Sequence, residues 1–106
     1  MAYNTLGETM NNSISVFQLL KLQAPLIIDI RDKARYDKGH IPGAISVPMS
    51  ELTKNPSKYL NFTNTYYIYC EFGYRSKRVR EVLLGLGYHV VDITDGYYGY
   101  EAYLSK

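Results

Sequence analysis

The stretch TYYIYCEFGYRSKRVREVL, residues 65–83, places a strand, a loop and the start of a helix in immediate succession, and it holds the only cysteine of the chain. Residues 65–69 are mostly aromatic or apolar, a run that is typical of a strand buried on both faces of a parallel sheet. Four later apolar residues follow the i, i+3, i+4, i+7 spacing of one helix face: Val79, Val82, Leu83 and Leu86. Gly87 is well placed to end this helix. Cys70 is therefore expected at the carboxyl end of a strand, where ligands gather in parallel α/β sheets.

The rest of the chain repeats this alternation of strands and helices. Three further strands are predicted, at residues 26–30, 44–47 and 89–93. Helices are predicted from a Ser15 N-cap to near Pro25, at residues 32–38, at 51–54 after a Ser50 cap, and at 97–105 after an Asp95-Gly96 turn. Strands and helices that alternate over short connections predict an α/β fold, in which a parallel sheet is covered by helices on both faces.

Length and composition indicate one compact domain. With 106 residues, 46% of them hydrophobic, a single apolar core can carry the fold. Residues 1–12 are polar and aperiodic, so we expect a flexible N-terminal tail before one domain over residues 13–106. The N-terminus lacks the basic start and apolar core of a secretory signal, and no apolar run approaches the roughly 20 residues of a membrane helix. We therefore expect a cytoplasmic monomer with no membrane contact, and the net charge of +2 is too small to indicate nucleic-acid binding.

A single cysteine cannot form an internal disulfide, which leaves a core residue, a metal ligand or a reactive thiol. His40 and His89 are not spaced with Cys70 like a metal set, so we expect neither a metal site nor a cofactor. Charge is unevenly distributed: residues 71–80 carry a local net charge of +3, whereas the remaining chain sums to −1. The excess positive charge lies beside the cysteine.

The loop after Cys70 has the composition of an anion cradle. A strand that enters a short loop with a central glycine and then a helix directs successive backbone N–H groups at one point, near the positive end of the helix dipole. Gly73 supplies permissive dihedral angles, Arg75 offers a fork of donors to an anion, and Ser76 is placed as a cap or hydroxyl donor. Such surroundings favour a thiolate nucleophile at Cys70. The alternative is an inert buried thiol, since free cysteine is among the most buried residue types.

Three segments together resemble the rhodanese-like domain family. The first is LIIDIRDKARYDKGHIPGAISVP, residues 26–48, with its Asp-x-Arg strand end and Gly-His-Ile-Pro-Gly-Ala turn. The second is the CEFGYRS loop, residues 70–76, and the third is DGYYGYEAY, residues 95–103. The family's usual Gly-Gly-x-x-x-Trp segment is replaced here by Asp95-Gly96 and Tyr100. The resemblance runs from about residue 14 to the C-terminus.

This resemblance implies a central five-stranded parallel sheet flanked by helices, with the fifth strand around Ser13–Ile14, and sulfur transfer through a cysteine persulfide. It implies that Cys70 accepts a sulfane sulfur from a small anionic donor such as thiosulfate and passes it to cyanide, a thiol or a protein. The expected substrate-binding residues form the rest of the loop: Glu71, Phe72, Gly73, Tyr74, Arg75 and Ser76. No general base is expected, since no histidine is near the loop in the sequence.

For several charged residues and one histidine, the sequence predicts a structural role or leaves the role open. Glu71 opposes thiolate formation and repels thiosulfate unless it points away or pairs with an arginine. Asp29 and Arg31 are each expected to form structural ion pairs or hydrogen bonds to neighbouring loops, and His40 is expected to brace a turn. Lys77, Arg78 and Arg80 form either a solvated helix face or a field that attracts an anionic donor.

Three alternative functions stay open. A phosphatase or arsenate reductase of the same fold has five residues between Cys and Arg, whereas this chain has four: Glu71, Phe72, Gly73 and Tyr74. A non-catalytic binding or regulatory module would have no need of Cys70 and Arg75. A protein-to-protein persulfide carrier is not distinguished from a thiosulfate enzyme by sequence, and an exposed apolar or tyrosine-rich rim is the structural feature expected of it.

Overall fold

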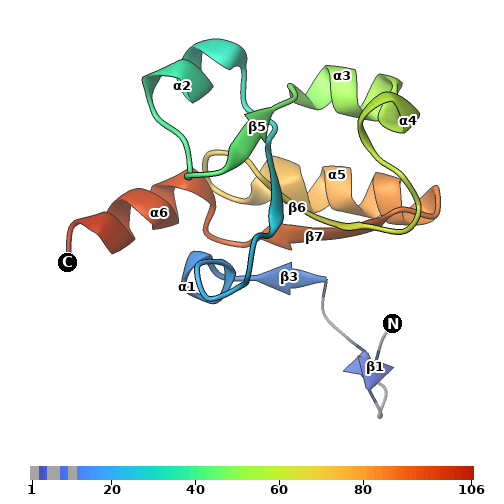
Figure 1. Ribbon diagram of the computed structural model, residues 1–106, viewed down its shortest axis with the longest axis horizontal. Coiled ribbons are helices and arrows are strands. Elements are labelled where there is room, and N and C mark those ends of the chain that lie inside the picture. Colours follow the sequence, from blue (N-terminus) through green and yellow to red (C-terminus); the bar gives the residue numbers. More distant parts are fainter. Residues whose placement is uncertain (1–2, 5–7, 10–11) are drawn as a thin grey trace.

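The computed structural model describes residues 3–4, 8–9 and 12–106. Within these residues, one sheet of five parallel strands has the order β3–β7–β6–β4–β5. The strands are β3 (Ser13–Ile14), β4 (Leu26–Asp29), β5 (Ala44–Ser46), β6 (Thr65–Tyr69) and β7 (His89–Ile93). The predicted five-stranded parallel sheet is confirmed, including the short first strand at Ser13–Ile14, and Figure 1 shows β6 and β7 running alongside each other at its centre.

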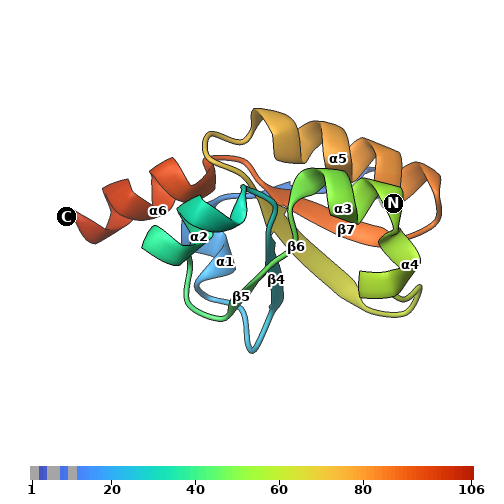
Figure 2. The same ribbon diagram turned by 90° about the horizontal axis from the view of Figure 1, so that it is seen from above.

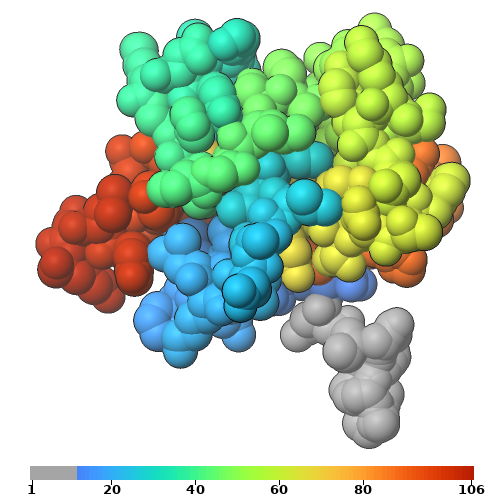
Figure 3. All heavy atoms as spheres, in the orientation of Figure 1, coloured from blue at the N-terminus to red at the C-terminus, as the bar shows by residue number. Residues whose placement is uncertain are grey.

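Helices cover both faces of this sheet. They are α1 (Val16–Leu19), α2 (Lys33–Lys38), α3 (Met49–Lys54), α4 (Pro56–Tyr59), α5 (Tyr74–Gly85) and α6 (Gly96–Leu104). One apolar cluster joins the sheet to α3 and α5, which lie side by side in Figure 2. A second cluster joins the opposite face to α1, α2 and α6, and the space-filling view of Figure 3 shows α1 (blue) in contact with α6 (red). This two-sided cover is what a parallel sheet with helical crossovers requires.

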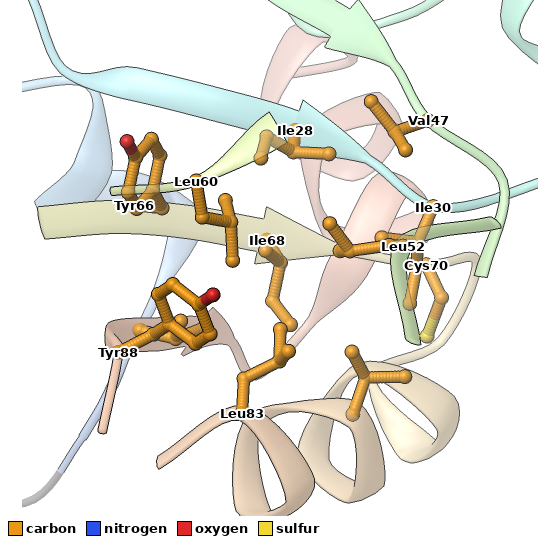
Figure 4. Packing of buried hydrophobic residues seen from close by; sticks show 12 residues of the cluster. Ile28, Ile30, Val47, Leu52, Leu60, Tyr66, Ile68, Cys70, Leu83 and Tyr88 are labelled. Carbon is orange, nitrogen blue, oxygen red and sulfur yellow. The ribbon is translucent and has the colours of Figure 1, made fainter. Parts of the chain in front are cut away.

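Strand β6 illustrates how one run of residues supplies both cores. Successive side chains of a strand point to opposite faces, so Tyr66, Ile68 and Cys70 join the cluster under α3 and α5, whereas Tyr67 and Tyr69 join the cluster under α1 and α6. Figure 4 shows Cys70 at one end of the first cluster, with its sulfur directed away from the apolar side chains around Ile68. The core therefore ends where the loop begins.

Two of the predicted helices differ at their ends from what the structure shows. Ser15 caps α1 as expected, by accepting the Gln18 N–H at 3.1 Å, but the helix ends at Leu19 and not near Pro25. The apolar side chains beyond it, Leu20 and Leu22, are exposed, and a short helix without tertiary packing does not propagate.

The predicted Ser50 cap is also wrong. Helix α3 begins at Met49, with Pro48 at the N-cap position, so Ser50 lies inside the helix. Helix α4 was not predicted from the sequence, although Pro56 at its first position is a known start signal.

Helix α5 buries a different face from the one predicted. Val79 and Leu83 are buried as expected, but Val82 and Leu86 are 50% and 53% exposed. The buried face instead consists of Ser76, Val79, Arg80 and Leu83. These positions also follow the i, i+3, i+4, i+7 rule, and the pattern was missed because two of the four residues are polar.

The prediction of a flexible tail over residues 1–12 falls partly outside the described residues. Within the described part, β1 (Tyr3–Asn4) and β2 (Glu8–Thr9) pair in antiparallel orientation. Across the described ranges, no helix has the length and apolar character needed to span a membrane.

Candidate active site

Cys70 lies directly after the last residue of β6, at the point where the chain turns into the loop that precedes α5. Its sulfur accepts the backbone N–H groups of Gly73 and Ser76, at 3.2 Å and 3.3 Å. The Cys70 S–H faces the Ser76 hydroxyl, with Sγ and Oγ 3.6 Å apart, and that hydroxyl donates to the Gly73 carbonyl at 3.3 Å. The residue is 5% exposed. Two backbone N–H groups, one from the loop and one from the first turn of α5, are thus directed at a single point, the sulfur atom itself.

The loop can adopt this shape only because residue 73 is glycine. Gly73 has a φ of +97° in the left-handed region and is the N-cap residue of α5, with no side chain available to cap the helix. A Cβ atom at this position would collide with the Thr94 carbonyl oxygen, which belongs to the connection between β7 and α6. Ser76, predicted as a cap or hydroxyl donor, lies buried in the first turn of α5: its hydroxyl donates to the Gly73 carbonyl, and its N–H is directed at the sulfur of Cys70.

The first turn of α6 holds the loop from the other side. The N–H groups of Tyr97 and Tyr98 donate to the carbonyls of Cys70 and Glu71, both at 2.9 Å. Gly96 permits this approach, because it has a φ of +59° and an added Cβ would lie 2.7 Å from the Cys70 carbonyl oxygen. With the loop carbonyls bonded to α6, the N–H groups of Gly73 and Ser76 remain directed at the sulfur. The Asp95-Gly96 turn, predicted from the sequence to precede the last helix, is thus a structural part of the site.

A cleft of about 390 Å³ opens above Cys70. Its lining residues come from the end of β4, from α2 with its N-cap, and from the loop into α5: Ile30, Arg31, Asp32, Arg35, Cys70, Glu71, Phe72, Tyr74 and Arg75. The structure therefore brings Cys70, Glu71, Phe72, Tyr74 and Arg75 to one cleft, whereas Gly73 and Ser76 lie below it as buried residues that hold the sulfur. Arg35 was not identified from the sequence, and Arg31 was expected only as a structural residue. The Asp-x-Arg strand end was the signal that could have placed Arg31 at this edge of the sheet.

Glu71 is paired with arginine, which was one of its two predicted arrangements. Its Oε1 lies 3.2 Å from the Nη1 of Arg31 and 3.3 Å from the Nη1 of Arg35, and its side chain is 25% exposed. These are not the arginine of the loop: Arg75 is exposed and, among the described residues, forms no ion pair. The negative charge next to Cys70 is therefore compensated by residues far away in the sequence.

Asp29 and Arg31 have the structural role expected of them, but they pair with each other, which the sequence did not predict. Arg31 donates to both carboxylate oxygens of Asp29, with Nε at 3.1 Å from Oδ1 and Nη2 at 2.7 Å from Oδ2, and also to the Gly39 carbonyl at 2.7 Å. Burial by itself lowers the pKa of Arg31, but the bonds to Asp29 and Glu71 raise the pKa overall, so the guanidinium stays charged. Tyr69 donates to Asp29 at 2.7 Å, and burial followed by this bond raises the pKa of Tyr69. The bonds to Asp29 and to the Gly39 carbonyl hold the Arg31 guanidinium beside Glu71.

Helix α5 exposes fewer positive charges than the sequence indicated. Arg80 was expected on a solvated face, but it is 8% exposed and bonded to Asp92 at 2.6 Å and to Glu81 at 2.7 Å. Its charge is neutralised inside the protein. Lys77 and Arg78 are exposed as predicted.

His40 lies apart from the cleft. Its Nδ1 is 2.8 Å from the Tyr36 carbonyl oxygen and its ring stacks on the Tyr36 ring at 3.7 Å between centroids. This geometry agrees with a bracing role in the turn before β5. The cleft residues themselves include no histidine.

Comparisons with known proteins identify the family of this chain. The family model of the rhodanese-like domain matches residues 15–103. The adenylyltransferase and sulfurtransferase uba4 of Ogataea parapolymorpha is 31% identical over 97 residues, which is 91% of this chain but only 24% of that protein. The thiosulfate sulfurtransferase PspE of Escherichia coli is 32% identical over 82 residues, 76% of this chain and 79% of that protein.

A solved structure agrees as well. The crystal structure of SSP1007 from Staphylococcus saprophyticus has a TM-score of 0.73 and 34% identity, and the match covers 82% of this chain and 89% of that chain. The sheet order, the loop after β6 and the matched length of the family model lead to one conclusion: the chain belongs to the rhodanese-like domain family.

Proposed function

We propose that this protein is a sulfurtransferase that carries a sulfane sulfur as a persulfide on Cys70. The observation that carries the proposal is the position of the sulfur atom: it lies at the base of a cleft and accepts two backbone N–H groups, from Gly73 and Ser76. Donors aimed at a sulfur atom stabilise negative charge on it, whether the atom is the thiolate or the inner sulfur of a persulfide. The relationship to PspE, named as a thiosulfate sulfurtransferase, supports the same chemistry.

The reaction consists of two displacements at sulfur. In the first, the Cys70 thiolate attacks the outer sulfur of thiosulfate or a similar donor, a sulfur–sulfur bond forms, and the donor's own bond breaks with its electron pair leaving on sulfite. In the second, cyanide or a thiolate attacks the outer sulfur of the Cys70 persulfide, and the electron pair of the broken bond returns to Cys70. Neither step needs a metal or a redox cofactor, because electrons leave and return as pairs with the sulfur groups.

Five residues that follow Cys70 in the loop have a proposed role in these steps. Gly73 and Ser76 supply the N–H groups that hold the nucleophile, and the Ser76 hydroxyl adds a third polar contact. Arg75 is placed at the cleft to bind the anionic end of the donor, with Phe72 and Tyr74 as cleft walls. Four residues separate Cys70 from Arg75, which makes a smaller ring than the five-residue loops that bind a phosphoryl group, and this spacing favours sulfur over phosphate.

A second candidate is the transfer of sulfur from protein to protein. Three aromatic side chains lie exposed on the loop and on α6, with Phe72 at 55%, Tyr74 at 79% and Tyr98 at 61%. The Phe72 and Tyr98 rings lie 5.7 Å apart. Exposed aromatic residues beside a cleft are typical of protein contact surfaces, and such a rim was the feature expected of a persulfide carrier. Replacing Tyr98 by Ala should slow loading by a protein persulfide while leaving loading by thiosulfate unchanged.

Intact mass measurement tests the proposal. After incubation with thiosulfate, and separately with a thiol persulfide, the wild type should gain one sulfur atom and lose it to cyanide with release of thiocyanate, whereas Cys70→Ser should gain none. An Arg75→Lys variant, which keeps the positive charge but loses the paired N–H donors of the guanidinium, should load sulfur more slowly. If no sulfane donor adds sulfur to the wild type, the sulfurtransferase proposal is wrong and the non-catalytic binding module becomes the favoured alternative. If it releases phosphate from aryl phosphates faster than it produces thiocyanate, the phosphatase alternative replaces this proposal.

A further inference from the structure

We propose that Glu71 sets the charge of the donor: it makes this cleft a site for sulfane donors with a single negative charge and disfavours dianions such as thiosulfate. This inference rests on the proposed function and specifies its substrate class. The observation behind it is that Glu71 bridges Arg31 and Arg35 in the wall of the cleft that contains Cys70.

The charges of the cleft nearly cancel. Its lining includes three cations, Arg31, Arg35 and Arg75, and two carboxylates, Asp32 and Glu71. Beneath the lining, Arg31 is also bonded to both oxygens of Asp29. Within the part of the chain that the structure describes, Arg75 is the lining cation without an ion-pair partner. One uncompensated cation matches a donor that carries one negative charge.

Glu71 is held where it acts on the donor. Its backbone carbonyl accepts the Tyr98 N–H at 2.9 Å, so the main chain of the loop cannot rotate freely at this residue. Its side chain is held by two guanidinium groups, of which Arg31 is itself 5% exposed and anchored by Asp29 and the Gly39 carbonyl. Because this fixed carboxylate occupies the guanidinium groups of Arg31 and Arg35, their positive charge is not available to a donor that binds in the cleft. Among the described lining residues, only Arg75 is then left to bind negative charge, so the second charge of thiosulfate, or of the sulfite that leaves from it, has no cation partner there.

A pair of small donors with the same reacting atom tests the inference. Thiosulfate is a dianion, whereas methanethiosulfonate is a monoanion that delivers its outer sulfur by the same displacement, with methanesulfinate as the leaving group. The measurement is the second-order rate of persulfide formation on Cys70, followed by rapid quench and intact mass at constant ionic strength. The ratio of the thiosulfate rate to the methanethiosulfonate rate is the quantity to compare, because general changes in loop reactivity cancel from it.

The variants should move this ratio in opposite directions. Glu71→Gln removes the negative charge and should raise the ratio on the order of tenfold, as expected for one unit charge acting on one extra charge across several ångströms at an intermediate dielectric. Arg35→Gln leaves Glu71 with one partner fewer and should lower the ratio; since Arg35 is an exposed residue, this variant should fold. Glu101→Gln is the matched control, because Glu101 lines the neighbouring cleft but not the one above Cys70, and its ratio should stay within twofold of the wild type.

The outcomes separate this inference from the proposed function. If both donors load the wild type but Glu71→Gln and Arg35→Gln leave the ratio within twofold, Glu71 does not select the donor by charge and the inference is wrong. If neither donor loads any of the four proteins, the failure lies with the persulfide chemistry proposed for Cys70. A shift in Glu71→Gln matched by an equal shift in Glu101→Gln would indicate a general effect of net charge and would also overturn the inference.

Discussion

Replacing Gly73 by alanine should disrupt the cradle around Cys70, and a second glycine of the chain provides the control. Gly73 and Gly43 have similar left-handed backbones, with φ of +97° and +89°. An added Cβ at Gly43 meets nothing within 4 Å, whereas at Gly73 it would collide with the carbonyl oxygen of Thr94. Both substitutions therefore carry the cost of an alanine in the left-handed region, and only Gly73→Ala adds a steric collision.

The expected magnitudes follow from these two contributions. An alanine in the left-handed region costs about 1–2 kcal/mol, and this should be the whole effect of Gly43→Ala on the free energy of unfolding. At Gly73 the collision is with backbone, which cannot swing away like a side chain, and crowding of this kind adds about 1–3 kcal/mol. Gly73→Ala should therefore destabilise the protein by about 2–5 kcal/mol.

Two assays separate stability from function. Urea denaturation of the wild type and both variants gives the free energies of unfolding, and persulfide loading with methanethiosulfonate is then measured under conditions where each protein is folded. Any shift of the loop that relieves the collision moves the Gly73 N–H away from the Cys70 sulfur, to which it now donates at 3.2 Å. Loading should fall at least tenfold in Gly73→Ala and stay unchanged in Gly43→Ala.

Equal destabilisation of the two variants, within about 0.5 kcal/mol, would show that contact with Thr94 does not constrain the loop. Normal loading by a folded Gly73→Ala protein would contradict the role of the Gly73 N–H in holding the nucleophile.

Three further predictions concern the buried polar groups around the site. Tyr69→Phe removes a bond to buried Asp29 and should cost about 1–3 kcal/mol in urea denaturation, so a loss below 0.5 kcal/mol would contradict this role. Because burial raises the pKa of Tyr69 above its ordinary value of 10.0, its contribution to stability is complete below pH 10 and declines as the pH rises further; the alkaline loss of stability should be shallower in Tyr69→Phe. Arg80→Ala leaves Asp92, which is 1% exposed, without its cation and should destabilise the protein by about 3–5 kcal/mol. The control is Lys77→Ala on the exposed face of the same helix, which should change the free energy of unfolding by less than about 0.5 kcal/mol. Similar values for both variants would show that the buried pair is not needed.

Four of the five strands were predicted closely because each is encoded by a short, mostly apolar run, whereas β3 (Ser13–Ile14) was expected only from the family resemblance. Residues 65–69 and 89–93 match β6 and β7 residue for residue, and Leu26–Asp29 and Ala44–Ser46 are each one residue shorter than predicted. Helix ends were less predictable. The stop of α1 at Leu19 depends on whether Leu20 and Leu22 find a core to pack against, and local sequence does not contain that information.

The buried face of α5 shows the same limit in another form. Helical periodicity by itself allowed a face through Val82 and Leu86, since both are apolar. The structure buries Ser76 and Arg80 instead, because one faces the sulfur of Cys70 and the other finds Asp92 on β7. A polar residue is stable inside only when a partner is there to bond it, and such partners come from other elements.

The sequence by itself determined the alternating α/β architecture, the position of Cys70 at a strand end and the four-residue spacing to Arg75. These are local properties: a strand, a tight turn at glycine and a helix start are set by neighbouring residues through backbone sterics and hydrogen bonding. Only the tertiary structure decided the environment of the cysteine. The Arg31 that neutralises Glu71 is 40 residues away in the sequence, and the N–H groups that hold the loop carbonyls come from α6. Contacts of this kind depend on how the sheet brings distant segments together, and no periodicity within the chain encodes them.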